Sequence, residues 1–155
     1  MPPAIDLLKK AKIDFRIHEY HHDPKNESFG QEAADNLGLA PEQVFKTLMA
    51  ETEQKELLVA VVPVSGSLDL KALAQAAGVK KCAMADPAKA QKVTGYLVGG
   101  ISALGQKKKH RTFIDETALD FSTIHISAGR RGLEVELAAI DLQALTEAHF
   151  ASIGK

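Results

Sequence analysis

One candidate for chemistry in this sequence is a lysine with apolar neighbours. Lys46 follows Phe45 and precedes Thr47 at the expected start of a strand. Such surroundings can partly desolvate an ammonium group that points into a cleft. The alternative is a side chain that extends to the surface with no chemical role, and spacing alone favours that alternative.

Two adjacent glycines form the next candidate. Gly99 and Gly100 end an apolar run that begins at Gly95, which we expect to be a short strand. With no side chains in the way, their N–H groups can approach a ligand closely and donate to a carbonyl or an oxyanion. The alternative is a bulge or a tight turn, and glycine alone does not separate the two. The patterns of a P-loop and of a dinucleotide-binding loop are both absent.

A second glycine-framed segment, 127–132, follows another predicted strand. Ser127 lacks the Gly-x-Ser-x-Gly context of a hydrolase nucleophile, so we expect only a polar contact from its hydroxyl. Arg130 and Arg131 suit phosphate contacts. The alternative, which the segment alone favours, is a hairpin turn with solvated arginines.

The densest basic run comprises Lys107, Lys108, Lys109, His110 and Arg111. It is a local excess in a chain whose 19 basic and 20 acidic side chains give a net charge of −1. The run suits phosphates, and it would form one basic face with Lys80, Lys81, Arg130 and Arg131 if the fold brings them together. The alternative is an ordinary solvated loop.

Histidine and cysteine add no predicted site. His18, His21 and His22 are close in sequence, but metal ligands must converge on one point. A strand sends His18 and Glu19 to opposite faces, so we expect a solvated strand end. Cys82 lies near basic residues but has no histidine paired with it in sequence, so we expect a structural, half-buried strand position. We predict neither a metal site nor a cofactor.

Composition places these candidates in one globular domain over residues 1–155. Apolar residues are 45% and charged residues 25%, which excludes a disordered chain and a collagen-like repeat. The single cysteine cannot form an internal disulfide, so we expect a reducing cytoplasm. No apolar stretch approaches the roughly 20 residues that span a bilayer, and the first residues lack a signal-peptide profile. We therefore expect no membrane partner, and a nucleic acid would need a local basic patch.

Hydrophobic periodicity and turn residues predict the elements that position these groups. We expect helices over 3–12, 31–37, 69–78 and 87–92, and a last helix that Asp141 caps and that runs through His149. We expect further strands over 15–20, 46–50, 57–64, 112–115, 123–127 and 133–138. The run 57–64 is almost entirely apolar, which is typical of a central strand covered on both faces. The order predicts an α+β fold with a mixed, strongly curved sheet.

Five segments occur in a familiar order. They are Phe45-Lys46-Thr47-Leu48, Val62-Pro63-Val64-Ser65-Gly66, Met84-Ala85-Asp86-Pro87, Thr94 to Ser102, and Ser127 to Gly132. Together they resemble the YbaK type of aminoacyl-tRNA editing proteins, the free-standing Cys-tRNA(Pro) deacylases. The likeness covers essentially the whole chain.

The resemblance implies a curved, mostly antiparallel mixed sheet flanked by helices. It also implies an enzyme that deacylates Cys-tRNA(Pro) in trans, with tRNA and prolyl-tRNA synthetase as partners. A second hydrolytic site is needed because one pocket cannot strongly reject a near-isostere of its substrate. The implied mechanism is substrate-assisted: the thiol of the substrate cysteine attacks its own ester, and tRNA leaves as a thiolactone forms. This mechanism fits a sequence without a recognisable nucleophile constellation.

Roles carried over by position follow from the same resemblance. Lys46 would hold the carbonyl or a nearby phosphate, and Gly99 and Gly100 would supply backbone donors. The residues expected to line the pocket or bind the terminal adenosine are Tyr20, Thr47, Tyr96 and Ser127. The residues expected to bind tRNA are Lys107, Lys108, Lys109, Arg111, Arg130 and Arg131. Ala103 stands where the family usually has proline, which frees φ there and could loosen the glycine loop.

Two other functions remain open at this point. One keeps the fold and changes the substrate to Ala-tRNA(Pro) or another small mischarged residue. The other is a non-catalytic module that binds tRNA or the synthetase. The match to the cysteine-specific type favours cysteine, and Lys46 beside an intact glycine pair favours catalysis.

Overall fold

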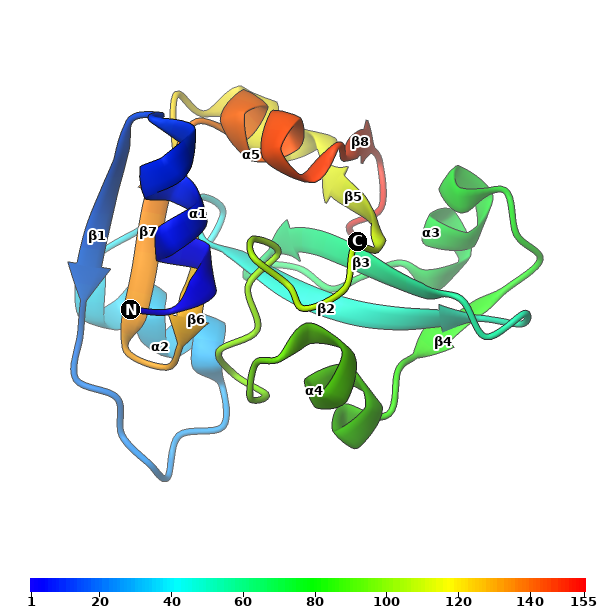
Figure 1. Ribbon diagram of the computed structural model, residues 1–155, viewed down its shortest axis with the longest axis horizontal. Coiled ribbons are helices and arrows are strands. Elements are labelled where there is room, and N and C mark those ends of the chain that lie inside the picture. Colours follow the sequence, from blue (N-terminus) through cyan, green and yellow to red (C-terminus); the bar gives the residue numbers. More distant parts are fainter.

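The computed structural model describes residues 1–155, which form five α-helices, one 3-10 helix and eight strands (Figure 1). The helices are α1 (Pro3–Ala11), α2 (Phe29–Leu37), α3 (Leu70–Ala77), α4 (Pro87–Thr94) and α5 (Ala139–Thr146), with the 3-10 helix η1 (Glu116–Asp120). The strands are β1 (Phe15–Glu19), β2 (Phe45–Thr52), β3 (Leu57–Pro63), β4 (Cys82–Met84), β5 (Arg111–Asp115), β6 (Ile124–Arg130), β7 (Leu133–Leu137) and β8 (His149–Ala151).

The smaller sheet has the antiparallel order β1-β7-β6. Because β7 alternates apolar and acidic residues, its apolar side chains share one face and Glu134 and Glu136 share the other. The apolar face packs against α1, whose Ile5 and Leu8 are fully buried. Figure 1 shows α1 in front of this sheet and α2 behind it. The polar face of β7 is thus not an open surface.

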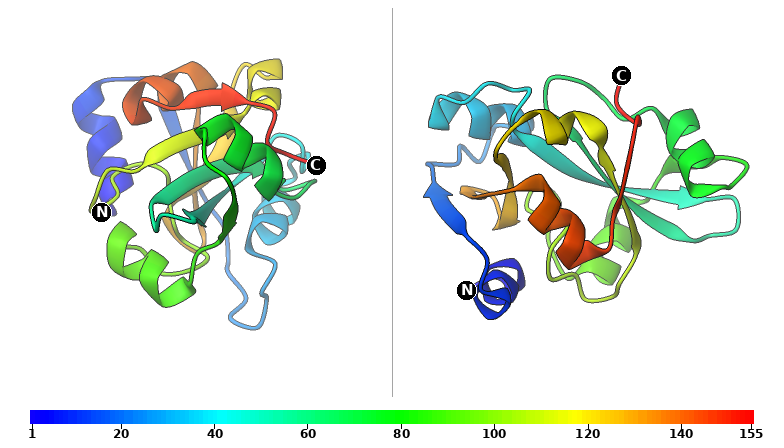
Figure 2. Two further views of the ribbon diagram at one scale, coloured as in Figure 1. Left: turned by 90° about the vertical axis from the view of Figure 1, so that its right-hand side faces the viewer. Right: turned by 90° about the horizontal axis from the view of Figure 1, so that it is seen from above.

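The larger sheet has the order β4-β2-β3-β5-β8 and is mixed. β2 is antiparallel to β3 and β4, whereas β5 is parallel to β3 and β8. A single bridge between Val44 and His125 links the two sheets, where one curved sheet was expected. Figures 1 and 2 show α4 and α5 on opposite sides of the molecule, with β2 and β3 between them.

The two hydrophobic clusters meet at β3. Its odd-numbered residues, such as Val59 and Val61, belong to the cluster of 24 residues that also holds α1 and the smaller sheet. Its even-numbered residues, such as Leu58 and Val62, belong to a cluster of nine beneath α3. The apolar run predicted over 57–64 is therefore a strand buried on both faces, as expected.

Two predicted elements differ from the structure. The segment 95–102 is a series of turns instead of a strand, because Gly95 and Gly99 have φ values of 82° and 90° that extended backbone does not adopt. The last helix begins after Ala138 instead of Asp141, and Asp141 N donates to Ala138 O at 3.0 Å. It ends at Thr146, and the chain continues into the short strand β8.

None of the helices is both long enough and apolar enough to cross a membrane.

Candidate active site

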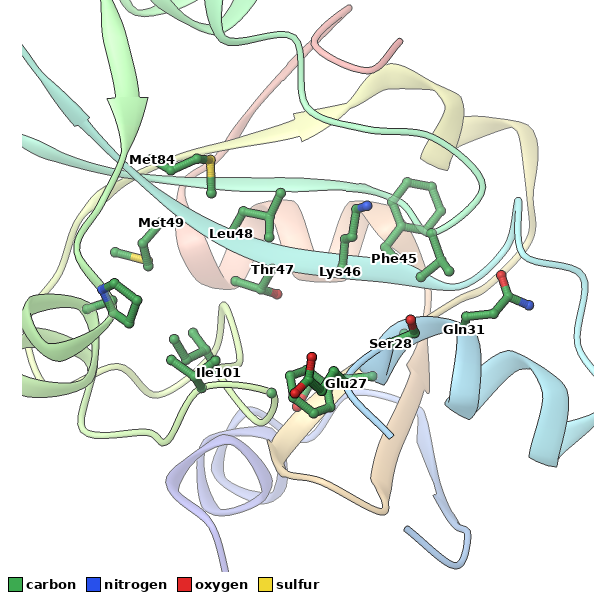
Figure 3. A pocket seen from close by; sticks show the side chains of 18 of the residues that line it. Glu27, Ser28, Gln31, Phe45, Lys46, Thr47, Leu48, Met49, Met84 and Ile101 are labelled. Atoms are coloured by element: carbon green, nitrogen blue, oxygen red, sulfur yellow. The ribbon is translucent and has the colours of Figure 1, made fainter. Parts of the chain in front are cut away.

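A cavity of about 540 Å³ lies between the two sheets. Its walls are formed by β2, the start of α2, α4, the loop around residues 98–101, and facing residues of β6 and β7 (Figure 3). Eleven of the 21 lining residues are hydrophobic, so a small number of polar groups determine what the cavity can bind.

Lys46 lines the cavity from β2. Its Nζ donates to Gly66 O at 2.8 Å, and burial lowers the pKa of the ammonium group. An ammonium group has three donors, so two of them have no protein partner. Figure 3 shows Lys46 and Thr47 leaving β2 on opposite sides, so the cavity reaches both faces of the strand.

The edge of β2 at the cavity has no neighbouring strand. β4 pairs only with Ala50 to Thr52, so residues 45–49 have β3 on one side alone. On the open side, Met49 O accepts from Ala85 N at 3.0 Å. Backbone groups of alternate strand residues point to the same side, so those of Thr47 also point to the open side. Thr47 Oγ1 is buried without a hydrogen-bond partner, so Thr47 offers backbone and side-chain groups to a ligand.

Glu134 and Ser127 are paired across β7 and β6, and both line the cavity. Glu134 is 5% exposed, and burial raises its pKa to about 8, so its carboxyl is mostly protonated at neutral pH. A protonated carboxyl can donate a hydrogen bond to a carbonyl oxygen. Tyr20 lines the same wall, and burial raises the pKa of its phenol.

Glu134 was not among the residues predicted from the sequence to act at the site. Its alternation with apolar residues in β7 gave it the pattern of a solvated face, shared with Glu136. The cavity that Glu134 lines is also lined by Phe29 of α2, about a hundred residues earlier in the chain. The periodicity within β7 gives no indication of a neighbour so distant in sequence.

Gly99 lies at the cavity beside a contact between Arg131 and Phe29. The guanidinium carbon of Arg131 is 4.1 Å from the centroid of the Phe29 ring, and the group donates to Val98 O at 2.8 and 3.1 Å. A Cβ on Gly99 would lie 2.4 Å from Arg131 Nε and would require a φ near 90°. Glycine is therefore required here, and its N–H donates to no protein group.

Gly100 and Tyr96 do not lie where their expected roles would require them. Gly100 does not line the cavity, and its N–H closes a turn by donating to Leu97 O at 2.9 Å. Tyr96 is 4% exposed in the core, where its hydroxyl donates to Leu104 O at 2.6 Å. Neither group is free to contact a ligand in the cavity.

Ala103 does not leave the glycine loop loose. Ala103 is buried, and the backbone beside it is fixed by side chains. Leu104 N donates to Ser102 Oγ at 3.2 Å, and Gln106 Nε2 donates to Ser102 O at 3.0 Å. These contacts hold the loop without a proline ring.

The residues expected to bind tRNA do not form one uniform face. Arg131 lies against the cavity wall through its contact with Phe29. Arg111 begins β5, outside the cavity lining, and forms a bidentate ion pair with Glu56 at 2.8 and 2.9 Å.

The other basic candidates, like these two arginines, are exposed. Lys109 forms an ion pair with Glu147. Lys107, Lys108 and Arg130 have no ion-pair partner and remain available to phosphates.

No histidine or cysteine lines the cavity. His22 Nδ1 shares a hydrogen bond of 2.6 Å with Glu32 Oε1, which fastens the loop before α2. Cys82 lies in β4, in the half-buried strand position that we expected. Burial and the nearby carboxylates of Glu53 and Glu56 raise the pKa of its thiol, which disfavours the nucleophilic thiolate.

The fold and the cavity define a class: an α+β domain with a chamber that presents hydrogen-bond donors between two sheets. A family model described as the aminoacyl-tRNA editing domain matches residues 24–145. The chain belongs to this aminoacyl-tRNA editing family.

One relative supports the same assignment. A protein of Enterococcus faecalis, provisionally named the Cys-tRNA(Pro)/Cys-tRNA(Cys) deacylase EbsC, is 35% identical over 150 residues. The alignment covers 97% of this chain and 91% of that protein.

Solved structures share the fold at lower identity. The hypothetical protein APE2540 gives a TM-score of 0.87 at 21% identity, with 99% of each chain covered. A protein provisionally assigned as a trans-editing enzyme for prolyl-tRNA synthetase gives 0.85 at 22% identity, covering 100% of this chain and 98% of that one. The predicted α+β fold with a mixed, mostly antiparallel arrangement is confirmed.

Proposed function

We propose that the cavity holds the aminoacyl end of mischarged Cys-tRNA(Pro) and that the chain cleaves its ester bond. The chain is an aminoacyl-tRNA deacylase, an activity that its family and its 35% identical relative support. Cysteine as the amino acid is supported by the name of that relative. We further propose that residues 1–155 act as one unit, because β1, outside the matched range, pairs with β7 at the cavity wall.

The observation that carries the mechanism is the chemistry of the lining. It contains no histidine and no cysteine, and Ser127 Oγ already accepts from Gly129 N at 3.3 Å. Glu134 is mostly protonated near neutral pH and is a poor general base there. The nucleophile is therefore best supplied by the substrate's own thiol.

The proposed cleavage needs no reagent other than the substrate itself and water. The substrate sulfur attacks the ester carbonyl carbon, the bond from that carbon to the ribose oxygen breaks, and the thiol proton passes to that oxygen. A four-membered thiolactone forms and water then opens it to cysteine. The protein positions the ester and stabilises charge on the carbonyl oxygen.

We propose that three groups of the chain do this. Lys46 has two unpaired N–H donors, and Thr47 has an unpaired hydroxyl on the open edge of β2. Gly99 has a backbone N–H that no protein group accepts. We assign these donors to the carbonyl oxygen or the adjacent phosphate, and Tyr20, Ser127 and Glu134 to the amino acid or the terminal adenosine.

The partner is tRNA, and the exposed Lys107, Lys108 and Arg130 are the proposed phosphate contacts. We also propose that prolyl-tRNA synthetase delivers the substrate, in the cytoplasm. A structural neighbour assigned to that synthetase supports this partner.

The experiment is a deacylation assay with Cys-, Ala- and Pro-tRNA(Pro) side by side. We expect rapid loss of cysteine, slow loss of alanine and none of proline. Faster hydrolysis of Ala-tRNA(Pro) would show that alanine, not cysteine, is the amino acid removed. Binding of all three tRNAs without hydrolysis would identify a non-catalytic module.

A further inference from the structure

A second polar cluster lies outside the cavity, on the same face of the smaller sheet as Glu134. His18 of β1, His125 of β6 and Glu136 of β7 each offer one ligand atom, and these atoms lie within 4.8 Å of one another. His18 Nε2 is 2.9 Å from Glu136 Oε1. Figure 1 shows the three strands side by side, although β1 lies more than a hundred residues before β6 and β7 in the sequence.

His125 is the unexplained member of this cluster. It is 3% exposed, its Nδ1 is buried without a partner, and its ring makes no hydrogen bond in the protein. Its ring centroid is 5.3 Å from that of His18. A buried polar ring without partners is costly, and native proteins normally satisfy such a group.

Glu136 is already oriented by a neighbour. Thr123 Oγ1 donates to Glu136 Oε2 at 2.6 Å, which leaves Oε1 directed toward His18. Metal sites commonly use such outer hydrogen bonds to fix a ligating carboxylate. The hydrogen bond from Thr123 thus prepares one carboxylate oxygen for a ligand.

We propose that His18, His125 and Glu136 bind a divalent transition metal, with Zn²⁺ as the best fit. Two imidazoles and one carboxylate form a common three-ligand zinc set, to which a water adds as the fourth ligand. Mg²⁺ and Ca²⁺ prefer oxygen donors throughout, so the nitrogen donors exclude them. His18 is partly exposed, which gives the ion a path from solvent.

The proposed ion is structural and separate from ester cleavage. None of its three ligands lines the cavity. It would tie the edge strand β1, which pairs only with β7, directly to β6 as well. His125 and Glu136 are each two residues, or about 7 Å, along their strands from Ser127 and Glu134. His18 lies directly opposite Glu134 in the β1–β7 pair, so the site adjoins the cavity wall. Binding would stiffen that wall.

The test is titration of the full chain with Zn²⁺ and, as a spectroscopic probe, with Co²⁺. We expect one equivalent of Zn²⁺ to bind and to raise the melting temperature, and Co²⁺ to give the visible absorption of a four-coordinate centre. His18 and Glu136 are partly exposed, so His18→Ala and Glu136→Gln should leave the fold intact, as circular dichroism would verify. Each should weaken the Zn²⁺ affinity at least about tenfold.

The matched control is His21→Ala, an exposed histidine three residues from His18. It should keep the wild-type affinity and the full rise in melting temperature. Absence of stoichiometric binding in the wild-type chain would overturn the proposal. So would equal affinities in the wild-type chain and both ligand variants, because the ion would then bind elsewhere.

Discussion

Glu134 lies directly opposite Ser127 in the β7–β6 pair, and both residues line the cavity. One is a carboxyl whose pKa burial raises to about 8, and the other is a hydroxyl that accepts from a backbone amide. This wall therefore presents a neutral acid to the substrate near pH 7, and its donor is lost as the carboxyl ionises.

The first prediction concerns the pH dependence that Glu134 gives to stability. The folded state holds this proton up to about pH 8, whereas the unfolded chain loses it near 4.5, the ordinary value. Native stability therefore falls as the pH rises through that window, by at most about 1.4 kcal/mol per pH unit. Glu134→Gln should remove this decline, so the variant gains stability relative to the wild type from pH 5 to pH 8.5. Urea unfolding of both proteins at pH 5 and pH 8.5 measures this difference in the free energy of unfolding.

The control for Glu134 is Glu116→Gln, an exposed change on η1. It should leave the pH dependence of unfolding as it is in the wild type. A Glu134→Gln variant whose stability runs parallel to the wild type at all pH values would show that the carboxyl is ionised in the folded protein.

The second prediction concerns Lys46. Its free donors beside the cavity should stabilise charge at the ester, so Lys46→Ala should lower the deacylation rate on the order of 10²-fold. Single-turnover kinetics with Cys-tRNA(Pro) measures the rate, and circular dichroism checks the fold. Lys71→Ala, on the exposed face of α3, is the matched control. A native rate in the Lys46 variant would remove this residue from the mechanism.

The third prediction concerns the lysines at 107–109. Neutralising all three should weaken tRNA binding and reduce its salt dependence by about one unit of slope per lost phosphate contact. Lys109 already pairs with Glu147, so we expect the effect to come mainly from the other two. The rate of ester cleavage in bound substrate should not change. Neutralising Lys9 and Lys10 on α1 is the control, and an equal loss of slope there would point to general charge alone.

The fourth prediction tests the origin of the nucleophile. Ser-tRNA(Pro) has nearly the same size as the cysteine ester but a far less acidic attacking group. It should bind comparably and be cleaved much more slowly. Equal rates would indicate an activated water instead of the substrate thiol.

Cys82→Ala separates the enzyme's own thiol from that of the substrate. Cys82 lies in β4, outside the cavity lining, with a raised pKa, so the variant should deacylate Cys-tRNA(Pro) at the native rate. A folded but inactive Cys82→Ala protein would return this thiol to the mechanism.

Local patterns predicted the elements well where one residue sets the geometry. Asp69 caps α3 by accepting from Lys71 N and Ala72 N, and Gly78 ends that helix with a left-handed φ, as expected. The segment 95–102 could not be predicted in this way, because an apolar run is compatible with a strand and with buried turns.

The site was predictable in part, for a related reason. Lys46 and Thr47 lie at the cavity together with Gly99, whereas Tyr96 is buried in the core. Glu134 was not anticipated, because its environment is created by α2, far away in sequence. Contacts within one element leave a local pattern, but contacts between distant elements leave none.

The open edge of β2 has a consequence for the behaviour of the protein in a crowded solution. An unpaired strand edge is a template for intermolecular pairing and aggregation. Here residues 45–49 lie in a cavity that α2 and the loop around Gly99 also line, and these neighbours hinder the approach of another strand. The same walls that leave these backbone groups to a ligand therefore also hinder their pairing with a strand of a second folded chain.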